Sequence, residues 1–252
     1  MRLAHTLVLL VALYAAGCIH YVAEECPSCR VLNPRHPGEP EPKLPRIKRS
    51  TKRLFVLVPG ALGYGWEWNA AVRGLEAAPD TEFVVFWWEP YHTVLDASRA
   101  LSRSVNDLLT PVEPRALEEV VIVAHSIAGI VAAHAAPELA APPNVRLVLA
   151  TIGTPFAGMV GPEFGFPDQT GSIALFAAFS AWLEYPSPAP GVDIIEYRTT
   201  WPEDPVMQPR MGHDPAPASI GPQPRRRVQL PHMDHNRCVE LVVKRLIARE
   251  YE

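Results

Sequence analysis

Ser126 is the residue of this chain with the clearest capacity for chemistry. It lies in EEVVIVAHSIAGIVAAHAA (residues 118–136), where a short apolar run typical of a buried strand gives way to a small-residue helical pattern. A residue on such a sharp turn from strand to helix has strained backbone geometry and an exposed side chain, and it needs small neighbours such as Ala124 and Ala128. A serine hydroxyl there can act as a nucleophile if a base and an orienting group are in reach. The alternative is a simple helix cap.

The elements that would position Ser126 alternate between strand and helix patterns. Strand patterns cover residues 53–60, 82–89, 120–126, 145–153, 192–200 and 226–232, and helix patterns cover residues 66–78, 94–109, 127–136 and 237–250. Continuous apolar runs such as RLFVLVPG are typical of parallel strands buried on both faces. We therefore predict an α/β fold with an open, mostly parallel six-stranded sheet and helices on both faces. Ligands bind such sheets at the carboxyl ends of the strands.

Three segments resemble the α/β-hydrolase fold, in particular its compact lipase and esterase branch. LVPGALGYGW (residues 57–66) resembles the loop that completes the oxyanion hole, and VVIVAHSIAG (residues 120–129) resembles the nucleophile elbow, with A-x-S-x-A in place of G-x-S-x-G. LATIGTPFAG (residues 149–158) resembles the exit of the family's sixth strand. The resemblance begins near Leu54 and implies a minimal version of the fold, in which a Pro-rich spacer replaces the first two strands of larger members.

Carried over residue by residue, the resemblance implies that Ser126 is the nucleophile and that an acid and a histidine follow it in chain order. WPEDPVMQP, after the strand pattern of residues 192–200, contains Glu203 and Asp204. We favour Asp204, because the D-P-V sequence there resembles the family's acid turn, and keep Glu203 as the alternative. Asp193 begins a strand and would lie at the wrong end of the sheet.

The base should lie between the last strand and the last helix, where LPHMDHNRCVELV contains His232 and His235. We favour His235, because Asn236 is a suitable N-cap and would place His235 in the loop above the carboxyl edge of the sheet. His232 remains the alternative. His125 and His134 are expected to be structural.

The resemblance also assigns the oxyanion hole to the backbone N–H groups of Ala61 and Ile127. An insertion at about residues 156–190 contains an apolar helical pattern over residues 173–182, which fits either a lid that contacts acyl chains or a core helix over the sheet. The candidate pocket residues are aromatic or apolar: Leu62, Tyr64, Phe156, Phe176 and Phe179.

The N-terminus has the pattern of an export signal over residues 1–17, followed by Cys18 in a sequence that resembles a bacterial lipobox. Residues 18–52 are expected to form a lipid anchor and a Pro-rich tether, and residues 53–252 the folded domain. A simple cleaved signal and a retained transmembrane segment are the alternatives. In an oxidising compartment Cys26 and Cys29 could form a local disulfide, whereas Cys238 is expected to be a buried thiol.

Composition narrows the range of ligands. The 252 residues carry a formal net charge of −4 with both signs dispersed, which argues against nucleic acid as a partner. The sequence contains no G-x-G-x-x-G motif, P-loop or metal-ligand cluster, so no cofactor or metal is expected.

These features predict a membrane-anchored lipoprotein of the bacterial cell envelope that cleaves carboxylic esters, with lipids or small hydrophobic esters as substrates. A thioesterase or an acyltransferase would use the same residues. The alternative from another class is a catalytically silent lipoprotein of this fold that binds a lipid or a protein partner.

Overall fold

The computed structural model describes residues 30–32, 45–60, 65–86, 94–110, 116–156, 189–199 and 226–251. The strands are β1 (Arg30–Val31), β2 (Arg53–Val58), β3 (Thr81–Val85), β4 (Glu119–His125), β5 (Arg146–Ile152), β6 (Val192–Arg198) and β7 (Arg226–Gln229). The helices are α2 (Gly65–Ala77), α3 (Val94–Leu109), α4 (Ala128–Ala135), the 3₁₀ helix η1 (Ala136–Glu138) and α6 (Arg237–Ile247). The expected signal, Cys18 and the helical pattern at residues 173–182 lie outside the described residues.

The strands form one sheet in the order β1-β3-β2-β4-β5-β6-β7, and every neighbouring pair is parallel. β3 lies on one side of β2, and β4, the next strand along the chain, lies on the other side. The strand order therefore reverses between β2 and β4, the place at which open parallel sheets bind their ligands. The predicted fold class, an open parallel sheet with helices on both faces, is confirmed.

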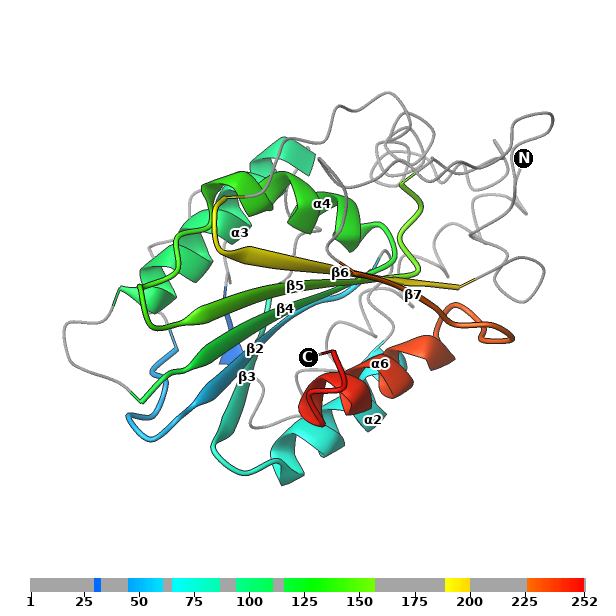
Figure 1. Ribbon diagram of the computed structural model, residues 1–252, viewed down its shortest axis with the longest axis horizontal. Coiled ribbons are helices and arrows are strands. Elements are labelled where there is room, and N and C mark those ends of the chain that lie inside the picture. The colour runs from blue at the N-terminus through cyan, green and yellow to red at the C-terminus, as the bar shows by residue number, and fades with distance from the viewer. Residues whose placement is uncertain are drawn as a thin grey trace, which may run out of the picture.

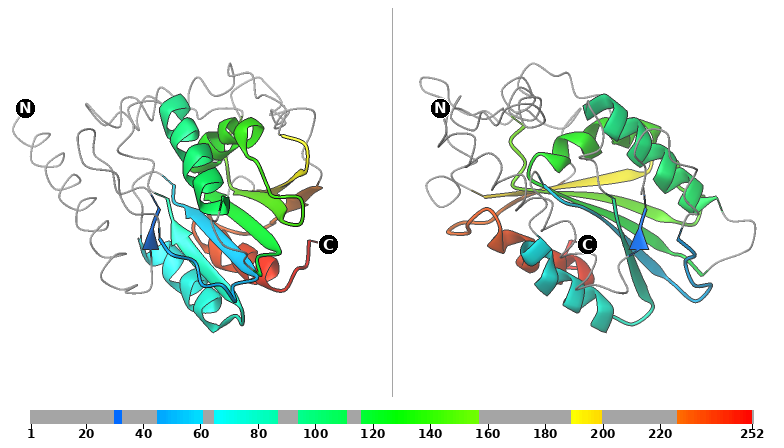
Figure 2. Two further views of the ribbon diagram at one scale, coloured as in Figure 1. Left: turned by 90° about the vertical axis from the view of Figure 1, so that its left-hand side faces the viewer. Right: turned by 180° about the vertical axis from the view of Figure 1, so that it is seen from behind.

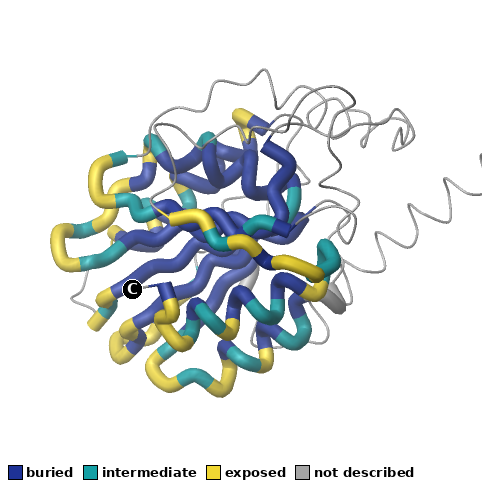
Figure 3. Tube along the Cα trace, turned by 45° about the vertical axis from the view of Figure 1, so that its right-hand side comes forward, coloured by how far each residue is buried: buried dark blue, intermediate teal, exposed yellow. Residues whose placement is uncertain are grey.

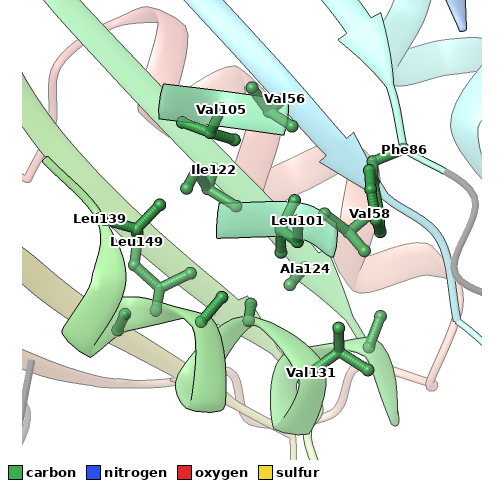
Figure 4. Close-up of a cluster of buried hydrophobic side chains, with 14 of the residues drawn as sticks. Val56, Val58, Phe86, Leu101, Val105, Ile122, Ala124, Val131, Leu139 and Leu149 are labelled. Carbon is green, nitrogen blue, oxygen red and sulfur yellow. The ribbon is translucent and has the colours of Figure 1, made fainter. Parts of the chain in front are cut away.

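Among the described helices, α3 and α4 cover one face of the sheet and α2 and α6 cover the other (Figures 1 and 2). Successive residues of β2 alternate between the two sides. Val56 and Val58 point into the cluster that α3 and α4 complete, which Figure 4 shows, and Phe55 and Leu57 belong to the cluster on the α2 and α6 side. Within the described residues, none of the helices combines the length and apolar character needed to cross a membrane.

Burial explains why the central strands read as uninterrupted apolar runs. Every residue of β2 and of β4 is buried, because helices cover both faces of these strands (Figure 3). The edge strand β7 is mostly exposed and begins with Arg226 and Arg227. Charged side chains on an exposed edge disfavour pairing with another chain.

The described domain extends N-terminal of the boundary expected at Arg53. Arg30 and Val31 pair in parallel with β3, and the N–H of Leu32 donates to the carbonyl oxygen of Val85 (2.8 Å). Leu32 and Ile47 are both buried in the cluster on the α3 and α4 side. The six predicted strands are thus joined by a seventh, in the segment where an extended Pro-rich tether was expected.

A buried polar network ties α6 to the amino ends of β2 and β4. Arg53 pairs with Glu119 (Nε to Oε2, 2.8 Å) and donates to the carbonyl oxygens of Leu246 and Ile247, both at 2.8 Å. The Tyr251 hydroxyl donates to Glu119 Oε1 at 2.7 Å. These contacts add side-chain donors to carbonyls in the last turn of α6, where the Leu246 oxygen also accepts from the N–H of Arg249 (3.2 Å).

Candidate active site

Ser126 occupies the turn between β4 and α4 in a strained backbone conformation. Its φ is 56°, in the left-handed region that residues other than glycine seldom adopt. Its N–H donates to the carbonyl oxygen of Ile152 (2.8 Å), and its own carbonyl accepts from the N–H of Gly129 (3.0 Å). Ile127 is the N-cap of α4, so a simple helix cap does not describe the position of Ser126. The backbone thus makes the strained elbow between strand and helix that the sequence predicts here.

The turn after β2 lies directly against this elbow. A Cβ atom on Gly60 would lie 2.8 Å from the Cβ of Ser126, closer than real Cβ atoms approach. The absence of a side chain at Gly60 therefore lets the segment that leads to Ala61 begin beside Ser126. Residues 61–64, with Ala61, Leu62 and Tyr64, lie outside the described residues. Ile127, the other expected oxyanion residue, is buried at the start of α4.

His235 reaches the same edge of the sheet from the loop between β7 and α6. Its Nδ1 and Cε1 atoms lie 3.2 and 3.3 Å from the position that a Cβ atom on Gly153 would take, at the end of β5. Its ring centroid is 4.6 Å from that of His125, the residue before Ser126. His232, the alternative base, is exposed. The structure thus brings His235 next to the residues that flank Ser126.

His125 also holds the main chain of the His235 loop. Its Nε2 lies 2.8 Å from the carbonyl oxygen of His235, and because a carbonyl oxygen only accepts, Nε2 carries the hydrogen. The Cys238 thiol donates to the same oxygen at 3.0 Å. The sequence predicts a structural histidine at 125, but nothing in it indicates this partner 110 residues away.

The expected acids, Asp204 and Glu203, lie outside the described residues, but the strand that precedes them ends at this site. The Oγ1 atom of Thr199, directly after β6, is 3.3 Å from the Cβ position of Gly153, which the His235 ring also approaches. Asp193, by contrast, lies at the amino end of β6, away from this site, and pairs with Arg146 (Oδ2 to Nε, 3.1 Å).

Of the expected pocket residues, the structure describes Phe156, and Phe176 and Phe179 lie outside the described part. The Phe156 side chain is 2% exposed and belongs to the core cluster on the α3 and α4 side. Its aromatic ring therefore packs into the domain in this structure.

The side chain that caps α6 is Asp234. Its Oδ1 accepts from the backbone N–H groups of Asn236 (3.0 Å) and Arg237 (2.8 Å). Asn236 occupies the N-cap position, as expected, but its side chain makes no capping bond. The Asp234 carboxylate, two residues earlier, accepts from these N–H groups instead. Aspartate favours such local turns, in which its side chain bonds to the backbone that follows. This turn fixes the backbone on both sides of His235.

The remaining histidine of this region, His134, lies within α4, and burial lowers the pKa of its side chain. This position is consistent with the packing role expected for it. Across the described ranges, no group of three His, Cys, Asp or Glu side chains is arranged to hold a metal ion.

No family profile and no curated protein sequence matches this chain. Among solved structures, esterase B from Lactobacillus Rhamnosis (HN001) has a TM-score of 0.52 at 11% identity, covering 100% of this chain and 98% of that one. ClbQ from the colibactin NRPS/PKS pathway also has a TM-score of 0.52, at 13% identity, covering 79% of this chain and 97% of that one. At such identities the likeness concerns the fold. With the sheet order and the elbow at Ser126, it shows that the chain has the α/β-hydrolase fold.

Proposed function

We propose that this protein is a serine hydrolase that cleaves carboxylic esters through an acyl-enzyme intermediate. The observation that carries the proposal is the strained elbow at Ser126, with His235 brought from more than a hundred residues away to the same edge of the sheet. Backbone strain of this kind costs about 1–3 kcal/mol and persists where the surrounding structure enforces it, often at functional sites.

In the proposed reaction His235 takes the hydroxyl proton of Ser126 while the serine oxygen attacks the ester carbonyl carbon. The tetrahedral intermediate collapses, the carbon–oxygen bond to the alcohol breaks, and His235 gives its proton to the departing alcohol. Water then attacks the acyl-enzyme with His235 again as the base, which releases the carboxylic acid and restores Ser126. The N–H groups of Ile127 and Ala61 would stabilise the oxyanion, and loss of one such donor costs about 3 kcal/mol.

The orienting acid in this proposal is Asp204. The Nδ1 atom of His235 lies 3.2 Å from the Cβ position of Gly153, which the Thr199 hydroxyl also approaches, at 3.3 Å. Thr199 is the point at which the chain leaves β6 toward Asp204. A carboxylate that follows this strand is therefore suited to accept from Nδ1–H, the nitrogen that orients the base in a serine triad.

We infer that the substrates are lipids or other hydrophobic esters and that a lipid on Cys18 keeps the enzyme at a membrane. The apolar and aromatic residues of the sequence at Leu62, Tyr64, Phe176 and Phe179 support this inference. Thioester hydrolysis and acyl transfer to an alcohol use the same acyl-enzyme, so the proposal extends to them as competing outcomes of the test.

The test is hydrolysis of p-nitrophenyl esters of increasing chain length by the full chain and by Ser126→Ala. Turnover and labelling by a fluorophosphonate probe should disappear in this variant. Ser104→Ala is the matched control, since Ser104 lies in α3, a helix in which alanine is well tolerated. Turnover that survives Ser126→Ala would contradict the proposed nucleophile. No turnover and no labelling of the unmodified chain would favour a silent lipid-binding or protein-binding lipoprotein.

A further inference from the structure

We propose that His125 is a positioning residue that fixes the loop of the general base to the nucleophile elbow. This inference rests on the proposed function, because it assigns a role to a residue that supports Ser126 and His235. His125 is the last residue of β4 and precedes Ser126 directly. A displacement of its ring relative to β4 would therefore be transmitted to both halves of the site.

The elbow is the rigid partner in this contact. β4 pairs with β5 over its full length, His125 included, and with β2 from Glu119 to Ala124, and His125 is 1% exposed. The His235 loop, by contrast, has mostly half-buried or exposed residues between β7 and α6. A bond from a buried, sheet-anchored ring to a loop carbonyl restricts the loop more than the elbow.

The bond is directed at the base residue itself. His125 Nε2–H donates to the carbonyl oxygen of His235, and the two rings are in contact at a centroid distance of 4.6 Å. Cys238 donates to the same oxygen through a weaker S–H group. Two donors on one carbonyl fix the backbone from which the His235 imidazole projects.

This geometry also argues against a direct role of His125 in proton transfer. Its Nε2 hydrogen is directed to a carbonyl oxygen, which has no proton to return. Its Nδ1 lies 3.3 Å from the Cβ position of Gly60, at the base of the turn after β2. His125 thus lies where the turn after β2, the elbow and the base loop meet.

Two amide substitutions test the role. In His125→Gln the amide nitrogen lies the same number of bonds from Cβ as Nε2 of histidine, so it can still donate to the His235 carbonyl. In His125→Asn the amide nitrogen reaches only the place of Nδ1. Both variants keep a polar, uncharged side chain, so their difference isolates the Nε2 contact.

With a short-chain p-nitrophenyl ester as substrate, His125→Asn should lower kcat by about 100-fold with little change in KM, as expected when a catalytic group is displaced by about 1 Å. His125→Gln should restore most of kcat. Cys238→Ala should lower kcat less than His125→Asn. Thermal unfolding of each variant shows whether the fold is kept.

Hydrogen exchange gives a second measurement that needs no turnover. Amides of residues 230–239 should exchange faster in His125→Asn than in the unmodified chain or in His125→Gln. Equal kcat in both amide variants, or unchanged exchange in His125→Asn, would overturn the positioning role. An unmodified chain without activity would instead contradict the proposed function, and the exchange comparison would still decide the role of His125.

Discussion

At the scale of single residues, two close approaches shape the elbow. Gly60 lies against the Cβ of Ser126, and Gly129 lies against the side chain of Thr154, where an added Cβ would overlap Oγ1 and lie 2.7 Å from Cγ2. Ala124 and Ala128, the positions at which the motif departs from glycine, are fully buried. The tight contact lies at Gly129, one residue after Ala128.

Gly129→Ala should therefore destabilise the fold, although alanine is the better helix former. Thr154 is buried and cannot rotate into solvent, so the added methyl group overpacks the core at a cost of about 1–3 kcal/mol. Gly74→Ala, in α2, is the matched control. A Cβ atom at this position would contact only Ile247 Cδ1, at an ordinary distance of 3.5 Å. This variant should gain up to about 1 kcal/mol from helix propensity. Urea unfolding of both variants measures the difference; equal effects would contradict the close contact.

The positions and contacts of the candidate site residues differ in how far the sequence alone predicts them. Ser126 and His235 are predictable because a strand-to-helix turn and a loop before a helix leave local patterns. The capping by Asp234 and the contact between His125 and His235 are not. Asp234 and Asn236, two residues apart, are both suitable to cap α6, and the sequence does not say which does. The His125 contact depends on how β4 packs against a loop 110 residues away.

At the scale of elements, α6 is held at its C-terminal end by the network around Arg53. Glu119 is buried and accepts from Arg53 at Oε2 and from Tyr251 at Oε1, and the Nη1 atom of Arg146 lies 3.8 Å from Oε1. The network lies at the edge of the sheet opposite Ser126. Changes there are expected to affect stability and to leave Ser126 and His235 in place.

Tyr251→Phe should lower the free energy of unfolding by about 1–3 kcal/mol at neutral pH, because Glu119 loses a buried hydrogen-bond donor. Burial, together with the bond to Glu119 and the charge of that residue, raises the pKa of Tyr251 above its ordinary value of 10.0. Above pH 10 the unfolded chain therefore binds fewer protons than the folded one, so stability falls as pH rises.

Tyr251→Phe has no hydroxyl to titrate. Above pH 10 its free energy of unfolding, measured in urea, should therefore converge with that of the unmodified chain. Burial raises the pKa of Tyr197 in β6 to about 12, so this residue adds a loss of the same sign between pH 10 and 12 in both proteins. A gap between Tyr251→Phe and the unmodified chain that stays constant from pH 8 to 12 would argue against the pKa assigned to Tyr251.

The sequence predicts the long elements more readily than β1. Continuous apolar runs and helical periodicity extend over many residues in β4 and α3, and the structure places both close to the predicted ranges. β1 has only two residues within a Pro-rich segment. No period can be read from two residues, and their pairing depends on an open edge of β3.

At the scale of the whole molecule, the question is where the folded domain begins. Leu32 is 1% exposed and lies in the same cluster as Phe86 and Val94. Leu32 directly follows β1, which runs parallel to β3 at the edge of the sheet (Figure 2). A tether that only joined the domain to a lipid on Cys18 would leave such a side chain in solvent.

Leu32→Ala should therefore destabilise the domain by about 2–5 kcal/mol, the range observed when a buried leucine is truncated. Leu95→Ala provides the same substitution at a side chain that is 49% exposed on α3, and it should have little effect. Thermal and urea unfolding of the full chain give the two differences. If Leu32→Ala were as stable as Leu95→Ala, the domain would begin near Arg53, and the segment around β1 would be a tether that contributes nothing to the core.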